Sequence, residues 1–236
     1  MIPPYIKSPS PKRFTLVLDL DETLLHYMEG NVSNNANIVS TPNIANSQSD
    51  GTLYIRPGAD DFLGTLSQHY EIVIFTAAMK DYADWAIEHM NNSKCISHRL
   101  YRQHATPSAS GFYIKDLSRL GRDLSRTIIV DNIAENFQLQ PENGIFIKSW
   151  FTDPSDTALF ELAPLLVAIA QSPVGDVRDA LKLFRQYMLE QMARGVANPT
   201  LHLAQNIRQL LDKHYNKISP KQQPRRLAHQ KGLYNK

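Results

Sequence analysis

The chain has 236 residues and a formal net charge of +2, which leaves room for one α/β core with an appendage. Its single cysteine, Cys95, excludes an intramolecular disulfide framework and favours a reducing compartment, so we expect an intracellular protein, nuclear or cytoplasmic. The sequence has no apolar run of about 18 residues, no secretory signal and no nucleic-acid-binding motif. We therefore expect no membrane span, and the sequence gives no ground for a nucleic-acid partner.

A strand that ends in two acids is the central feature of the sequence. Residues 14–18 form a nearly continuous apolar run, typical of a strand covered on both faces, and Asp19 and Asp21 follow it. Open α/β sheets bind ligands at the carboxyl ends of their strands. Two carboxylates buried there need a cation, and Mg²⁺ with a phosphate and its cationic partners supplies that compensation. The alternative is a surface turn with two unpaired acids.

Expected strands and helices alternate along the rest of the chain, which favours an α/β fold with a parallel sheet. The asparagine-rich stretch 27–52 is expected to be a polar loop insertion, and segments 99–101 and 111–114 are expected to pair as a hairpin. The further expected strands are 53–55, 71–75, 127–130 and 144–147. The expected helices are 59–69, 80–90, 155–170, 174–195 and 201–217.

Three segments give the predicted domain organisation. Residues 13–172 form the α/β domain, 173–217 a helical extension, and 218–236 a tail. The tail is rich in Lys and Arg and contains no acid, so we expect it to be disordered and able to contact an acidic partner.

Further polar residues stand where other apolar runs end. Thr76 follows 71–75, Lys115 follows 111–114, and Asp131 and Asn132 follow 127–130. Because parallel strands end at one edge of the sheet, we expect these side chains to converge on Asp19 and Asp21. Taken singly, the threonine is also suited to cap a helix, the lysine to lie on a surface turn, and the last pair to form a turn.

In this order the motifs resemble the C-terminal-domain (CTD) phosphatase family of the haloacid-dehalogenase-like superfamily. The resemblance is closest to the small CTD phosphatase (NLI-interacting-factor-like) branch, and it covers roughly residues 13–170. The matching segments are Asp19-Leu20-Asp21-Glu22-Thr23, Arg56-Pro57-Gly58, Phe75-Thr76-Ala77, Tyr82-Ala83-Asp84, Arg99-Leu100-Tyr101-Arg102, residues 115–124, Asp131-Asn132, Ser149-Trp150-Phe151 and Ser155-Asp156-Thr157.

The resemblance implies a Rossmann-like fold and a Mg²⁺-dependent protein serine/threonine phosphatase. Asp19 would be the nucleophile that forms an aspartyl-phosphate, and Asp21 the general acid and base. The metal would be held by the Asp19 carboxylate, the Asp21 main-chain carbonyl and Asn132.

The same resemblance assigns the phosphate contacts. Thr76 and Lys115 would bind the equatorial phosphoryl oxygens, where negative charge is neutralised in the transition state. Asp131 would orient Lys115 or a metal-bound water. His26, next to the first motif, is expected to pack or cap rather than catalyse.

The insertions at 27–52 and 79–114 are too short to form a separate lid domain. An open site admits a phosphorylated protein, including peptides like the RNA polymerase II C-terminal domain, and the resemblance points to Met79, Tyr82 and Arg102 as peptide contacts. Small CTD phosphatases carry an aromatic residue after the first motif that helps to form a proline pocket. This chain has Met28 and Glu29 there, which leaves a Ser-Pro preference open.

Two other functions and one other metal site fit parts of the sequence. A binding scaffold on the same fold, like the mitochondrial import receptor branch, tends to lose the catalytic acids, which this chain keeps. A small-molecule phosphatase is disfavoured by the missing lid. A zinc site at Cys95, His98 and His104 offers three ligands without a convincing fourth.

Overall fold

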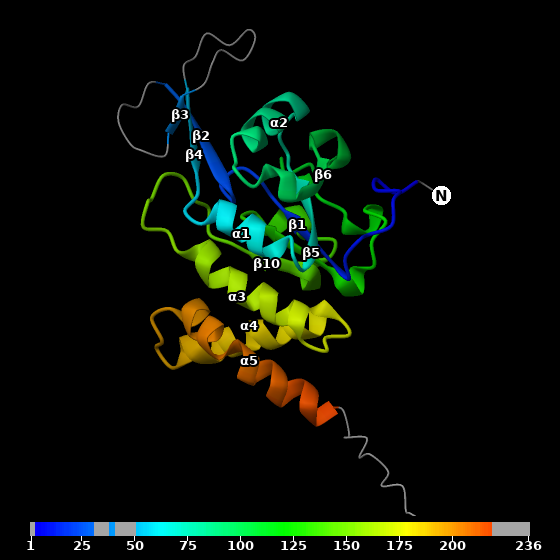
Figure 1. Cartoon of the computed structure of the whole chain (residues 1–236), viewed down its shortest axis with the longest axis vertical. Coiled ribbons are helices and arrows are strands. Elements are labelled where there is room, and N and C mark those ends of the chain that lie inside the picture. Colours follow the sequence, from blue (N-terminus) through cyan, green and yellow to red (C-terminus); the bar gives the residue numbers. More distant parts are fainter. Residues whose placement is uncertain (1–2, 31–37, 41–50, 219–236) are drawn as a thin grey trace, which may run out of the picture.

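The computed structural model describes residues 3–30, 38–40 and 51–218. Its centre is a five-stranded parallel sheet in the order β10-β9-β1-β5-β6 (Figure 1). The middle strand, β1 (Phe14–Leu18), is buried at every position, as expected for a strand between β5 (Tyr70–Phe75) and β9 (Thr127–Asp131). The outer strands are β10 (Gly144–Phe146) and β6 (Ile96–Leu100). The predicted α/β class with a parallel sheet is confirmed.

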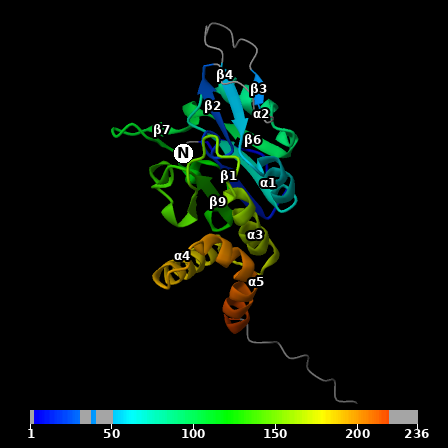
Figure 2. The same cartoon turned by 90° about the vertical axis from the view of Figure 1, so that its left-hand side faces the viewer.

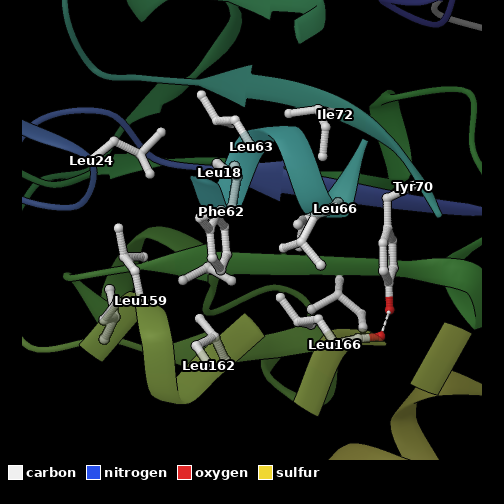
Figure 3. Packing of buried hydrophobic residues seen from close by; sticks show 14 of the residues in the cluster. Leu18, Leu24, Phe62, Leu63, Leu66, Tyr70, Ile72, Leu159, Leu162 and Leu166 are labelled. Carbon is white, nitrogen blue, oxygen red and sulfur yellow. Dashed lines mark hydrogen bonds between the residues drawn. The ribbon is translucent and has the colours of Figure 1, made fainter. Parts of the chain in front are cut away.

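Helix α1 (Ala59–Leu66) and helix α3 (Ala158–Gln171) form the main core against this sheet. Figure 3 shows Phe62 and Leu66 of α1 lying between the sheet and α3. Tyr70, at the start of β5, donates a hydrogen bond of 2.7 Å to the carbonyl oxygen of Leu166 in α3. Burial of each such leucine or phenylalanine side chain contributes about 1.5–3 kcal/mol to stability.

Helices α4 (Val177–Ala193) and α5 (Pro199–Ile218) form a further layer beside α3, away from the small sheet described below (Figure 2). Phe184 of α4 and Leu203 and Ile207 of α5 belong to the same buried cluster as α1 and α3. The boundary placed at residues 172 and 173 stays a prediction. None of the described helices combines the length and the apolar character that a membrane crossing requires.

The stretch expected to be a polar loop contains strands. β2 (Leu25–Glu29), β4 (Gly51–Ile55) and β3 (Ile38–Ser40) form an antiparallel sheet in that order. The loop prediction for 27–52 is therefore wrong at these positions. The asparagine-rich composition concealed β2 and β3, whereas the predicted strand 53–55 lies within β4 and buries Leu53. The rest of the predicted insertion, 31–37 and 41–50, lies outside the described residues, as does the predicted basic tail at 219–236.

The predicted hairpin between 99–101 and 111–114 is also wrong. Arg99 and Leu100 belong to β6, which pairs in parallel with β5 after helix α2 (Lys80–Glu88). The hairpin that does form joins β7 (Thr106–Pro107) to β8 (Tyr113–Ile114). Lys115 therefore follows a hairpin strand, not a strand of the central sheet, and reaches the site from outside the sheet.

Candidate active site

Asp19 stands at the carboxyl end of the central strand, and its side chain is buried. Its Oδ1 accepts a hydrogen bond of 2.5 Å from the Lys115 ammonium, and its Oδ2 accepts one of 3.0 Å from the Thr23 hydroxyl. The turn after Asp21 is tight, because Glu22 takes a left-handed φ of 56°. This turn returns the Thr23 side chain to the carboxylate four residues before it. Both oxygens of the predicted nucleophile are therefore held in place.

Lys115 is fully buried between two carboxylates. Its Nζ lies 2.5 Å from Asp19 Oδ1 and 2.6 Å from Asp131 Oδ2. Burial alone would lower the pKa of Lys115, but the two carboxylates outweigh it and raise that pKa, so the ammonium is charged. Burial, together with the charge of Asp19, raises the pKa of Asp131 to about 6. Asn136 donates to both Asp131 oxygens, at 3.1 and 3.3 Å, which fixes the carboxylate that positions the lysine.

Asp21 lies beside this cluster and has an environment of its own. Burial raises its pKa to about 6, while the Tyr82 hydroxyl, which donates to Asp21 Oδ1 at 2.6 Å, opposes that rise. Thr76, directly after β5, brings its hydroxyl to 3.4 Å from Asp21 Oδ2. The Thr76 oxygen also accepts a hydrogen bond from the Ala78 N–H at 2.9 Å, which orients it. A carboxyl group with a pKa near 6 suits a group that must both give and take a proton.

Asn132 stands directly after β9, and Asp131 is the last residue of that strand. The amide nitrogen of the Asn132 side chain donates a hydrogen bond of 3.0 Å to the hydroxyl oxygen of Ser149. Because the nitrogen is engaged in this way, the amide oxygen is the end suited to a cation. The pairing of β1 with β9, in which Leu18 lies beside Val130, puts Asn132 at the same edge of the sheet as Asp19. The role of Asn132 as a metal ligand stays a prediction.

The predicted peptide contacts lie in one cleft. Met79, Tyr82 and Arg102 line it with Ala77, Ala78 and Asp21. Met79 is 57% exposed, and Arg102 is held by a 2.6 Å hydrogen bond from its Nε to the Ala77 carbonyl oxygen. The cleft therefore leads over the start of α2 to the carboxyl group of Asp21.

Sequence reasoning assigned no role to a buried arginine next to the site. Arg56 donates from Nε and Nη2 to the two carboxylate oxygens of Asp156, at 2.8 and 2.9 Å. It also donates to the carbonyl oxygens of Thr23 and Lys148, each at 3.1 Å. Arg56 thus ties together the turn that supports Asp19 and the segment that carries Ser149. The motifs containing Arg56 and Asp156 were visible in the sequence, but nothing in them indicated that the two residues pair.

The two histidines of the alternative zinc site, and His26 beside the first motif, contact other side chains or the main chain. His98 Nε2 lies 3.1 Å from Glu71 Oε1, and His104 Nδ1 accepts a hydrogen bond of 2.9 Å from the Tyr101 N–H. His26 Nδ1 lies 2.9 Å from Glu22 Oε1. These contacts account for the three histidines as structural side chains.

The fold and the site define a haloacid-dehalogenase-type α/β protein. Among solved structures, a fission yeast RNA polymerase II CTD phosphatase bound to beryllium fluoride is similar in fold. Its TM-score is 0.51 at 20% identity, over 88% of this chain and 66% of that chain. A family model described as NLI interacting factor-like phosphatase matches residues 14–178. The chain belongs to this family, which confirms the family expected from the motifs.

Two curated relatives show the degree of similarity. A probable C-terminal domain small phosphatase from Dictyostelium discoideum is 44% identical over 169 residues, 70% of this chain and 52% of the relative. The CTD nuclear envelope phosphatase 1B from Danio rerio is 43% identical over 178 residues, 72% of this chain and 71% of the relative. The chain spans about half the length of the Dictyostelium relative.

Proposed function

We propose that this chain is a Mg²⁺-dependent protein serine/threonine phosphatase that acts through an aspartyl-phosphate on Asp19. The observation that carries the proposal is that Asp19 and Asp21 follow the central strand, the buried Lys115 contacts Asp19, and Asn132 follows the neighbouring strand β9. Family membership supports the same chemistry. The proposal extends to Thr76 as a phosphate contact beside Lys115.

The charges in the site fit a divalent cation. The Lys115 ammonium contacts the carboxylates of Asp19 and Asp131, while that of Asp21 contacts only the hydroxyls of Tyr82 and Thr76 among the described residues. The pKa values of Asp21 and Asp131 are raised to about 6. Such an excess of negative charge attracts a cation, and the donors on offer are oxygens, which Mg²⁺ prefers. Asp19, the Asp21 carbonyl and Asn132 would hold it, and it would supply charge neutralisation at the phosphoryl oxygens.

In the first step, an Asp19 carboxylate oxygen forms a bond to phosphorus while the bond from phosphorus to the serine or threonine oxygen breaks. Asp21 donates its proton to that leaving oxygen. Asp21 Oδ1 accepts the short hydrogen bond of 2.6 Å from Tyr82, whereas Oδ2 has only the Thr76 hydroxyl at 3.4 Å, so the transferable proton belongs on Oδ2. Lys115 and Thr76 stabilise the charge on the phosphoryl oxygens.

In the second step, Asp21 is a carboxylate and takes a proton from water. That water attacks phosphorus, the bond to Asp19 breaks, and inorganic phosphate leaves. The hydrogen bonds from Lys115 and Thr23 to the Asp19 oxygens then restore the nucleophile to its starting position.

The open cleft at Met79, Tyr82 and Arg102 supports a phosphorylated protein as the substrate. A bulky polypeptide has access to such a cleft, and the family name implies a phosphoprotein. Relatives named for the nuclear envelope support a place inside the cell, nuclear or cytoplasmic. Peptides like the RNA polymerase II C-terminal domain remain candidate substrates.

The test is phosphate release from a panel of phosphoserine and phosphothreonine peptides, with Mg²⁺ and with EDTA. We expect turnover by the wild type, loss of turnover with EDTA, and loss in Asp19→Asn. Asp61→Asn makes the same chemical change at an exposed position on α1 and should leave turnover intact. Equal turnover by the wild type and Asp19→Asn would contradict the nucleophile assignment. Sugar phosphates hydrolysed faster than every peptide would favour a small-molecule phosphatase.

A further inference from the structure

Some exposed apolar side chains stand close in sequence to residues of the candidate active site. Among the described residues, nine large hydrophobic side chains are exposed. Three of them stand next to site residues in the chain: Met79 just after Thr76, Ile133 directly after Asn132, and Phe151 just after Ser149. Exposed apolar side chains scattered singly need no explanation, but a group around a binding site points to a ligand surface.

Phe151 is held in an exposed position. Its ring meets the His26 ring edge to face, with the centroids 5.1 Å apart, and it is still 53% exposed. His26 is itself positioned by Glu22, with 2.9 Å between Nδ1 and Oε1. An exposed aromatic ring that is fixed in this way loses little conformational freedom when a ligand packs against it.

The segment that carries Phe151 is anchored to the catalytic turn. The main-chain N–H of Trp150 donates a hydrogen bond of 2.8 Å to the carbonyl oxygen of Glu22, the residue after Asp21. The buried Trp150 indole donates to the Asp153 carbonyl oxygen at 2.7 Å. The aromatic ring therefore has a fixed place relative to the general acid.

Neither Phe151 nor Ile133 belongs to the cleft lined by Met79, Tyr82 and Arg102. An extended peptide whose phosphate lies at Asp19 has chain on both sides of the phosphorylated residue. One side has the cleft available to it. The other side needs a different surface, and Phe151 is an exposed apolar side chain outside the cleft that is anchored to the catalytic turn through Trp150.

We propose that Phe151, backed by His26, forms a second substrate subsite. It would bind an apolar side chain close to the phosphorylated residue, on the side of the peptide that does not occupy the cleft. This inference rests on the proposed phosphatase function and adds the kind of sequence that the enzyme prefers. Because the ring is open to solvent on one face, the preference should be modest, about tenfold in kcat/KM.

The test uses phosphoserine peptides that are identical except at one position, where Leu, Gly or Asp is placed in turn on either side of the phosphoserine. We expect one position at which the wild type prefers Leu to Gly by about tenfold in kcat/KM. Phe151→Ala should reduce this ratio to below about twofold, while Phe151→Leu should keep most of it. Hydrolysis of the Gly peptides and of p-nitrophenyl phosphate should not change in either variant.

Phe160→Ala is the matched control. Phe160 is also 53% exposed, but it lies in the first turn of α3, so its removal should leave the Leu preference intact. The subsite would be overturned if no position shows the preference, if Phe151→Ala retains it, or if Phe151→Ala slows all substrates alike. A wild type that releases phosphate from no peptide would instead remove the proposed function, and the subsite with it.

Discussion

Replacing Arg56 with lysine tests whether this residue positions the site as well as stabilising the fold, because kcat and the unfolding free energy can be measured separately. Arg56 makes four hydrogen bonds to three segments, and two of those segments carry the residues that position Asp19 and Asn132. A lysine keeps the charge but cannot form the planar fork that binds both oxygens of Asp156. We expect the Thr23 turn and the Ser149 segment to move relative to each other.

The magnitude follows from the burial of the pair. The Arg56 side chain has no exposed surface and that of Asp156 is 14% exposed, so the hydrogen-bond acceptors that lysine leaves unsatisfied should cost about 1–3 kcal/mol of unfolding free energy. A displacement of catalytic groups by about 1 Å reduces turnover by about 100-fold. We therefore expect Arg56→Lys to lower kcat by about 10- to 100-fold and to leave KM for the peptide nearly unchanged.

The chain offers a matched control at the other end of the sheet. Arg122 binds both oxygens of the buried Glu71, at 2.6 and 2.7 Å, near the start of β5. Arg122→Lys should cost a similar free energy, about 1–3 kcal/mol, and leave kcat intact. Urea denaturation and steady-state kinetics, well below the melting temperatures of both variants, measure the two effects. If both lose kcat equally, or if neither does, Arg56 does not position the site.

Three further predictions concern single groups. Asp21 must be protonated to donate its proton, and its pKa is raised to about 6, so kcat should fall about tenfold per pH unit above pH 6. Tyr82→Phe removes a hydrogen bond that lowers the pKa of Asp21, so the falling limb of a pH–rate profile should move to higher pH. Lys115→Met leaves the carboxylates of Asp19 and Asp131 without their shared cation, so the single-turnover rate constant should fall by about 100- to 1000-fold. A variant that reacts as fast as the wild type would contradict the role proposed for Lys115. Tyr70→Phe removes the hydrogen bond from the Tyr70 hydroxyl to the Leu166 carbonyl oxygen, and urea denaturation should show a loss of about 1–3 kcal/mol in unfolding free energy. Because Tyr70 lies at the end of β5 opposite to Thr76, kcat should not change, and a loss of kcat would show that this core contact affects the site.

The sequence predicted the strands β1, β5 and β9, which are buried at every position, together with β10 and the second half of β4, but it missed β2, β3 and most of β6. β1, β5 and β9 are continuous apolar runs because helices and loops cover them on both sides. β6 escaped prediction because it lies at the edge of the sheet and carries exposed and half-exposed side chains. β2 and β3 were hidden by the asparagine-rich sequence between them.

The residues of the candidate site also divide into those that the sequence predicted and those that it did not. The residues at strand ends were predictable, because strand direction and chemistry together indicate that they converge. The pairing of Arg56 with Asp156 was not, because it joins residues 100 positions apart and leaves no periodic pattern. Tyr82 was expected to contact the peptide, and the structure adds a hydrogen bond from its hydroxyl to Asp21, which depends on how α2 packs.

The lysine that neutralises Asp19 lies 96 residues further along the chain. At about 5–20 residues per second, a ribosome adds those residues in roughly 5–20 s. During that interval the central strand has emerged with its acids but without their ammonium, and closing it into the sheet would bury uncompensated charge. Completion of the sheet during synthesis should therefore wait for the hairpin that delivers Lys115, so that a nascent chain acquires its chemistry and its compact core together.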